Sequence, residues 1–169
     1  CTNLQTVNIP ESVDTIESYA FFNCPSLQSL TIPGNLTTVK YNTFYGCTSL
    51  AVINLPNTVT TIENGAFNHC GLQHFTVPAG VTNIQSETFR DNTSLQTITF
   101  HDNVTYIGQW AFKGCTALQT LTLPQNVATV AYQAFADCTS LTTVNLPLYL
   151  CNSGGSNEPF SGCCALRNV

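Results

Sequence analysis

The sequence predicts a solenoid of stacked coils, because a unit of about 23 residues recurs through most of the 169-residue chain. Seven of its eight starting positions hold cysteine, apolar residues recur at fixed places, and six units carry a proline after the first apolar group. The spacings between successive starts are 23, 23, 23, 22, 23, 23 and 25 residues. The unit starts are Cys1, Cys24, Cys47, Cys70, Asn92, Cys115, Cys138 and Cys163.

These starts predict a single solenoid domain over residues 1–169. A lone unit buries too little apolar surface to offset the entropy lost on ordering it, so neighbouring units must supply the remaining burial and hydrogen bonds. The predicted divisions are 1–23, 24–46, 47–69, 70–91, 92–114 and 115–137, followed by an irregular stretch 138–162 and a half-repeat 163–169.

Each unit has two halves with different patterns. In the first half, Leu-x-x-Φ-x-Φ (Φ is apolar) ends in alternating apolar and polar residues, which is typical of a strand with one buried face. The proline that follows lacks an amide donor and ends the strand. The second half, Val-x-x-Ile followed by Ala-Phe, predicts a short extended segment and one turn of tight helix.

Three units depart from this pattern. Unit four lacks one residue after Cys70, and we expect the deletion to lie in a turn, where it costs least. Unit five begins with Asn92 and has His101 in place of the proline. Unit seven changes to CNSGGSNEPFSG over residues 151–162, which predicts a loop where the regular coil breaks down, before the pattern restarts at Cys163.

The unit C-T-x-L-x-x-Φ-x-Φ-P-x-x-V-x-x-I-x-x-x-A-F resembles the BspA-like leucine-rich repeat family, which occurs in surface proteins of bacteria and protists. The resemblance covers residues 1 to about 147 well and the remainder loosely. It implies a leucine-rich-repeat solenoid: a right-handed coil with a parallel β-sheet on the concave face and short extended or tight-helix segments on the other side. It also implies an extracellular or cell-surface protein that takes part in adhesion or in binding to a host or matrix.

The composition excludes several classes of partner. Only 8% of residues are charged, with four Lys and Arg against nine Asp and Glu, so we expect no nucleic-acid binding. No run approaches the eighteen or so apolar residues of a membrane helix, so we expect no membrane span in this chain. Asn, Thr, Ser and Gln supply most of the polar surface, as is typical of extracellular proteins.

The outward positions of the first-half strands form two polar columns, which we predict to be the contact surface. Strands in a sheet lie about 4.7–4.9 Å apart, so these columns make a grid of hydroxyls and amides. The predicted contact residues are Thr6, Asn8, Ser29, Thr31, Asn54, His74, Thr76, Thr97, Thr99, Thr120, Thr122, Thr143 and Asn145, with Val52 in the same column. Beside this face, Tyr106 and Trp110 form an aromatic shoulder that either holds a sugar or partner loop or packs against neighbouring turns.

Seven of the nine cysteines stand at unit starts, where we expect small buried side chains in an internal ladder that Asn92 joins by bonding backbone groups. One ligand per coil does not form a tetrahedral metal site. Cys151 and Cys164 lie off this column, and we predict a disulfide between them that holds the glycine-rich loop to the last half-unit. The alternatives are two free thiols or pairing with Cys163.

Three Asn-x-Ser/Thr sequons occur, at Asn35, Asn92 and Asn103. Asn35 and Asn103 lie in predicted exposed turns, and Asn92 belongs to the inward ladder. In a protein secreted by a eukaryote we expect glycans on Asn35 and Asn103 and none on Asn92. The alternative is that these sequons arise by chance in a chain rich in Asn and Thr.

The sequence predicts no catalysis and no cofactor or metal. His69, His74 and His101 occupy three different columns, so they need not converge on one ligand. The favoured function is an extracellular leucine-rich-repeat module for protein or glycan binding or adhesion. The alternatives are a structural protein whose copies stack end to end through open solenoid ends into a filament or cell coat, and, more remotely, ice binding through the Thr and Asn ladders.

Overall fold

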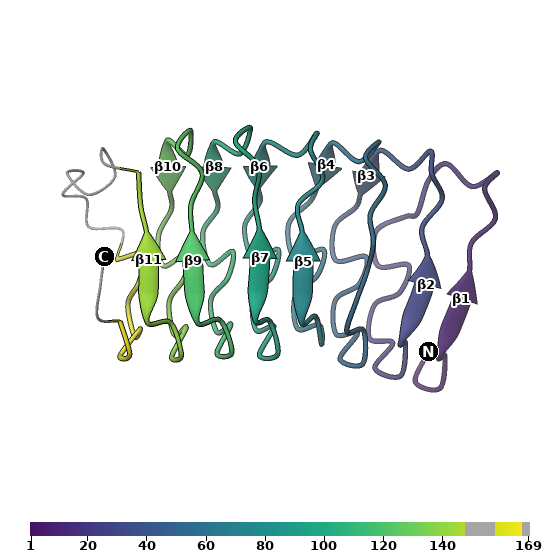
Figure 1. Ribbon diagram of the computed structural model, residues 1–169. Helices are drawn as coiled ribbons and strands as arrows, with labels where there is room; N and C mark the ends of the chain where they lie inside the picture. The colour runs from purple at the N-terminus through teal and green to yellow at the C-terminus, as the bar shows by residue number, and fades with distance from the viewer. Residues whose placement is uncertain (148–157, 167–169) are drawn as a thin grey trace.

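The computed structural model describes residues 1–147 and 158–166 and confirms the predicted solenoid of parallel strands (Figure 1). Two rows of short strands run along it, one from each half of the repeating unit. The first row is β1 (Thr6–Asn8), β2 (Ser29–Thr31), β5 (His74–Thr76), β7 (Thr97–Thr99), β9 (Thr120–Thr122) and β11 (Thr143–Asn145). The second row is β3 (Thr38–Val39), β4 (Thr61–Ile62), β6 (Asn83–Ile84), β8 (Tyr106–Ile107) and β10 (Thr129–Val130).

The register of the strands follows the repeat. Thr6 pairs with Ser29, His74 with Thr97, and Thr143 with Thr120, all in parallel. The first row is divided into three two-stranded sheets, β1 with β2, β5 with β7, and β9 with β11. In the second row, β3 pairs with β4, and β8 lies between β6 and β10.

The strand expected at residues 52–54 in unit three is not formed, and this prediction was wrong. The gap lies beside the one-residue deletion in unit four. There Gly71 donates its N–H to the carbonyl of Cys47 at 3.2 Å, and a Cβ on Gly71 would lie 2.1 Å from the carbonyl oxygen of Thr48. The shortened turn is therefore drawn against the preceding coil, and the first row is interrupted between β2 and β5.

The second half of the unit contains no helix among the described residues, so the predicted turn of tight helix is wrong. Each unit instead makes two successive turns in which left-handed residues recur, such as Tyr19 (φ 63°) and Asn23 (φ 51°). The N–H groups of Tyr19, Phe21 and Asn23 donate to carbonyls of the next coil at 3.1, 2.9 and 2.8 Å. Because alternate N–H groups point out of their own coil, a helical ladder within the coil cannot form.

These turns carry the most continuous hydrogen bonding in the solenoid. The same three bonds recur between the second and third units, where Asn42, Phe44 and Gly46 donate at 3.3, 2.9 and 2.9 Å. The turn side therefore joins the coils at the place where the first row of strands is interrupted.

A stack of phenylalanine rings runs through the core behind these turns. Consecutive rings lie 5.0–5.7 Å apart between centroids, with interplanar angles of 2–14°. Five of the seven are completely buried, and both end rings are half-buried. The stack comprises Phe21, Phe44, Phe67, Phe89, Phe112, Phe135 and Phe160.

The coil resumes earlier at its C-terminal end than the sequence predicted. Phe160 stacks on Phe135, and the N–H groups of Phe135 and Asp137 donate to the carbonyls of Pro159 and Ser161 at 2.8 and 2.7 Å. Residues 158–162 therefore belong to a regular turn, although we expected irregular structure up to residue 162. The segment EPFSGC repeats the pattern of NTFYGC in unit two, which explains why it forms the same turn.

Candidate binding surfaces

The thirteen predicted contact residues lie on one side of the first strand row, and we call them, with Val52, the strand face. All are exposed except Thr143, which is half-buried. Side chains pair across the strands: His74 Nδ1 lies 2.8 Å from Thr97 Oγ1, and Asn145 Nδ2 donates to Thr122 Oγ1 at 3.0 Å. The strand face is therefore a polar surface whose side chains are partly held in place by their neighbours.

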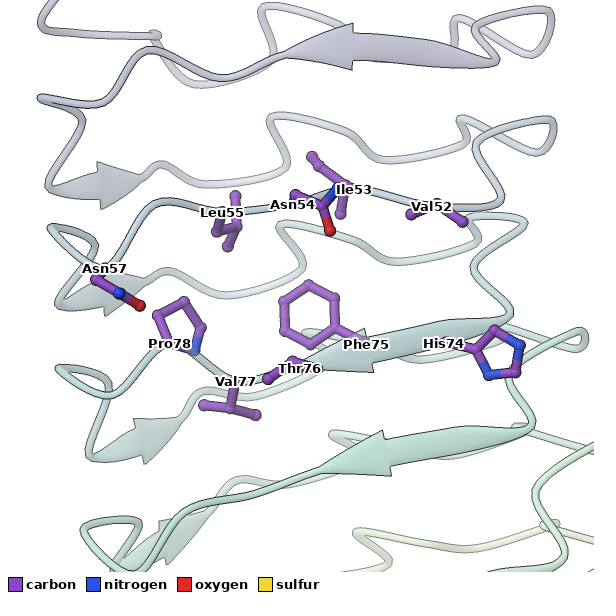
Figure 2. Close-up of a pocket in the computed structure, with 10 residues that line it drawn as sticks. All are labelled: Val52, Ile53, Asn54, Leu55, Asn57, His74, Phe75, Thr76, Val77 and Pro78. Atoms are coloured by element: carbon purple, nitrogen blue, oxygen red, sulfur yellow. The ribbon is translucent and has the colours of Figure 1, made fainter.

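A cleft of about 200 Å³ interrupts the strand face between units three and four. Figure 2 shows its two walls, the segment Val52–Asn57 and the segment His74–Pro78, which begins with β5, with the ring of Phe75 between them. Val52 is 51% exposed at one end of the cleft and stands out as an apolar residue among hydroxyls and amides. The gap in the strand row has thus created a hollow with an apolar rim.

The aromatic shoulder is placed away from the strand face. Tyr106 belongs to β8 in the second row, and Trp110 lies in the turn that follows, with φ of 55°. Trp110 Nε1 donates to Gln133 Oε1 at 3.2 Å, and the guanidinium carbon of Arg90 lies 5.5 Å from the centre of its ring. These contacts favour the alternative that Trp110 packs against neighbouring turns.

Five of the cysteines at the unit starts are buried inside the turns: Cys24, Cys47, Cys70, Cys115 and Cys138. Cys163 is half-buried and Cys1 is exposed in the first unit, so the expectation of burial was wrong for Cys1. Five of the thiols donate to the carbonyl of a phenylalanine in the core stack, with Sγ to O distances of 3.0–3.3 Å. Asn92 occupies the same column, is completely buried, and donates from Nδ2 to the carbonyls of Phe67 and Phe89 at 2.7 and 3.0 Å. The column therefore gives each of these carbonyls a side-chain donor, and the carbonyls of Phe44, Phe89 and Phe112 accept a backbone N–H as well.

The pKa shifts make Cys47, Cys70, Cys115 and Cys138 poor nucleophiles. Burial raises the pKa of Cys47 to about 12 and also raises the pKa values of Cys70 and Cys115, and a hydrogen bond with Cys163 together with burial raises the pKa of Cys138. Because the thiolate is the reactive form, we expect iodoacetamide at pH 8 to label the exposed Cys1 and Cys164 of the reduced, folded protein and to leave Cys47, Cys70 and Cys115 unlabelled.

Peptide mass spectrometry after tryptic digestion measures this difference, with the same protein in urea as the control in which every cysteine reacts. Rapid labelling of Cys70 or Cys115 in the folded protein would contradict the buried column.

The predicted disulfide stays a prediction, because Cys151 lies outside the described residues. Cys164 is an exposed thiol in the structure, with its Sγ 3.5 Å from the carbonyl of Gly162. The three sequons differ in exposure, as their positions in the repeat predicted. Asn35 and Asn103 are exposed, whereas Asn92 is fully buried. Whether a glycan is attached at either exposed asparagine stays a prediction.

The histidines lie apart, and His101 has a structural place. His101 stands where other units have proline, with Nε2 2.8 Å from the carbonyl of Pro78 and Nδ1 accepting from the Asn103 N–H at 3.2 Å. Within residues 1–147 and 158–166, no three His, Cys, Asp or Glu side chains are grouped to hold a metal ion.

In the same part of the chain, no helix is long and apolar enough to span a membrane.

Comparison with known families identifies the repeat. The model of the BspA type leucine rich repeat region matches residues 1–96 and 82–169, in six copies. The chain belongs to the BspA-type leucine-rich repeat family. The recognition made from the repeating unit, and the leucine-rich-repeat solenoid that it implied, are confirmed. No curated protein matches the chain.

Solved structures of other leucine-rich repeat proteins share this fold. A leucine rich repeat protein of T. pallidum (TpLRR) is 27% identical, with a TM-score of 0.60 over 98% of this chain and 69% of that one. A leucine rich cell surface protein of Faecalibacterium prausnitzii is 22% identical, with a TM-score of 0.56 over 98% and 66%. A leucine-rich repeat protein of Eubacterium ventriosum is 20% identical, with a TM-score of 0.60 over 98% and 54%. This BspA-type chain thus spans between about half and two thirds of the length of these proteins.

Proposed function

We propose that this BspA-type protein is an extracellular, cell-surface binding module that holds a protein ligand on its strand face, without catalysis. The observation that carries the proposal is the cleft between units three and four, where the exposed apolar side chain of Val52 interrupts the polar grid and His74 lines the opposite wall. Apolar residues surrounded by hydrogen-bonding groups are typical of the centres of protein interfaces. The remaining strand-face residues supply the polar rim.

Relatives and composition support this location. The similar F. prausnitzii structure is of a cell surface protein. Low charge and a surface of Thr, Asn and Ser are also in keeping with an extracellular protein. Antibody staining of intact, unpermeabilised cells of the source organism tests the location, and staining only after permeabilisation would contradict it.

The binding role is tested with Val52→Arg, which places a long charged side chain at the rim of the cleft. We expect this change to abolish binding to immobilised matrix proteins such as fibronectin, fibrinogen, laminin and collagen, measured by surface plasmon resonance. The matched control is Thr82→Arg in unit four, an exposed position beside the second strand row. Equal binding by both variants, or no binding by the unmodified chain, would count against the strand face as the contact surface.

The same samples test the alternative of end-to-end assembly through the solenoid ends. Light scattering and negative-stain images over a range of concentration report the mass and shape of the particles. Ordered fibres that form from the unmodified chain and from Val52→Arg alike would favour a structural role and displace the binding role. Ice binding is tested separately by thermal hysteresis, and the interruption of the grid at Val52 is unfavourable for matching a flat lattice.

A further inference from the structure

A cluster of aromatic side chains lies on the turn side of the first two units, away from the strand face. Tyr19, Phe22 and Tyr41 are 50%, 38% and 42% exposed, and Tyr45 is half-buried beside them. Tyr19 meets Phe22 and Tyr41 edge-on, with ring centroids 5.6 and 5.4 Å apart, and Phe22 stacks on Tyr45 at 4.9 Å. We call these four residues the aromatic cluster.

The cluster continues into two open clefts that share Tyr41 and Asn64. The first, of about 260 Å³, is also lined by Glu63 and Gln85. The second, of about 270 Å³, is also lined by Tyr45, Asn68 and Glu87. Ring faces on units one and two therefore adjoin amide and carboxylate groups on units three and four.

The polar groups in these clefts are held in place by the solenoid. A carboxylate oxygen of Glu63 accepts the N–H of Tyr41 at 2.8 Å, and Asn68 Nδ2 donates to a carboxylate oxygen of Glu87 at 3.3 Å. Backbone bonds between coils fix the same turns, including that from Asn42 N–H to the carbonyl of Asn64 at 3.3 Å. Because these side chains are already ordered, little conformational entropy is lost when a ligand binds, and this favours binding.

Electrostatics decide which class of ligand fits. The nearest cations are already paired: Lys40 with Glu17 at 2.7 Å, and Arg90 with Glu87 and Asp91 at 3.1 and 3.3 Å. Glu63 and Glu87 line the clefts, and only Glu87 of the two is paired with Arg90, so the remaining negative charge disfavours phosphate, sulfate and uronate groups. The rings and amides of the lining favour a neutral ligand, with apolar C–H faces for the rings and many hydroxyls for the amides and carboxylates.

We propose that the aromatic cluster and its two clefts form a binding site for a neutral oligosaccharide. The C–H face of one sugar ring packs on Tyr41 and its aromatic neighbours, and the hydroxyls of the following sugar bond to Asn64 and Glu63. A carboxylate accepts hydrogen bonds from two hydroxyls, and an amide both donates and accepts, so these groups match a sugar's hydroxyl pairs. This site is separate from the strand face and does not depend on the function proposed for that face.

The solenoid offers a matched control for Tyr41. Tyr132 occupies the same position in unit six and is also 42% exposed, but it lies four units away from the aromatic cluster. The site residue Asn64 also has a control, because Gln109 occupies in unit five the position that Asn64 occupies in unit three. Each site variant can therefore be compared with a change of the same residue type or size in the same local backbone.

The test is a titration of the protein with neutral oligosaccharides, in which saturation-transfer difference NMR and calorimetry measure binding. The oligosaccharides are cellohexaose, xylohexaose, mannohexaose, laminarihexaose and chitohexaose. We expect at least one of them to bind, Tyr41→Ala and Asn64→Ala each to raise its Kd about tenfold, and Tyr132→Ala and Gln109→Ala to leave it unchanged. Far-UV circular dichroism of each variant confirms that the coil is intact, and Asn64→Ala carries the test if Tyr41→Ala does not fold.

Three outcomes would overturn the proposal. They are no binding of any of the five oligosaccharides, equal losses in the site and control variants, and binding of a proline-rich peptide to the cluster in place of the sugars. A Val52→Arg variant that keeps sugar binding but loses its protein ligand would show that the two surfaces act independently.

Discussion

Replacing Phe67 by alanine is expected to lower the free energy of unfolding by about 3–5 kcal/mol. The ring is completely buried between those of Phe44 and Phe89, with centroids 5.4 and 5.7 Å away, and it also contacts Phe75. Its removal leaves a cavity that three rigid rings cannot close. Because each coil contacts only its neighbours, this cavity weakens the join between units three and four directly.

Urea unfolding followed by far-UV circular dichroism measures the loss. The control is Phe22→Ala, since this ring lies in an equivalent turn but is 38% exposed, stacking on Tyr45 and meeting Tyr19 edge-on at the surface. We expect it to lose about 1 kcal/mol or less. Similar losses for the two variants would contradict the view that the phenylalanine stack is the main core of the solenoid.

The arrangement of this core follows directly from the repeat in the sequence. Columns such as Phe44, Phe67 and Phe89 recur at one position of successive units, so each ring must lie above the last once the coils stack. A buried column permits little variation in size, which keeps its pattern clear. The same reasoning predicted the burial of Asn92, because it occupies a column otherwise filled by cysteine.

The hydrogen bonding between coils could not be predicted in the same way. A repeat of 23 residues places every side of one coil in register with the next. It therefore does not show which side forms the backbone hydrogen bonds between coils. The deciding features are left-handed residues such as Tyr19 and Trp110, and bulky side chains give no sequence signal for that conformation. The Ala-Phe pattern therefore suggested a tight helix where the structure has paired turns.

The aromatic cluster was missed because it breaks a column rather than repeating one. Tyr41 occupies a position held by Ser18, Asn64, Ser86 and Gln109 in four other units and by a second tyrosine, Tyr132, in unit six, so a smaller polar residue is the commoner occupant there. An aromatic residue at such a position is the signal that a comparison of exceptions would have found. A search of the sequence for repeated residues finds the core residues. It misses these candidate binding residues, because they lie where the repeat is interrupted.

Asn92→Asp is the second change with a large expected effect, a loss of about 3–5 kcal/mol at neutral pH. The substitution keeps the size of the side chain but removes the Nδ2 donor that bonds the carbonyls of Phe67 and Phe89. An ionised carboxylate would then face these carbonyl oxygens inside the solenoid. A buried charge without a donor is far more costly than a lost neutral hydrogen bond.

The loss of unfolding free energy should depend on pH, and burial of the carboxyl determines whether it grows or shrinks as the pH rises. Burial raises the pKa of the introduced carboxyl in the folded state above the value of about 3.9 for an unfolded aspartate. The neutral form is therefore tolerated below the unfolded pKa, where the variant is closest to the unmodified protein. The loss then grows by about 1.4 kcal/mol per pH unit until the folded pKa is reached. Urea unfolding of both proteins between pH 4 and pH 8 measures this difference, and a loss independent of pH would contradict it.

Asn92→Cys is the matched control, because it restores the residue found at the other unit starts. Its thiol is expected to donate to the carbonyl of Phe67, as Cys70 does to that of Phe44 at 3.0 Å. Among the described residues, Oδ1 of Asn92 is a buried acceptor without a hydrogen-bond partner, and removing it offsets the loss of the amide donor. We therefore expect Asn92→Cys to stay within about 1 kcal/mol of the unmodified protein. A loss as large as that of Asn92→Asp would show that the amide itself, rather than a neutral donor, is required in the column.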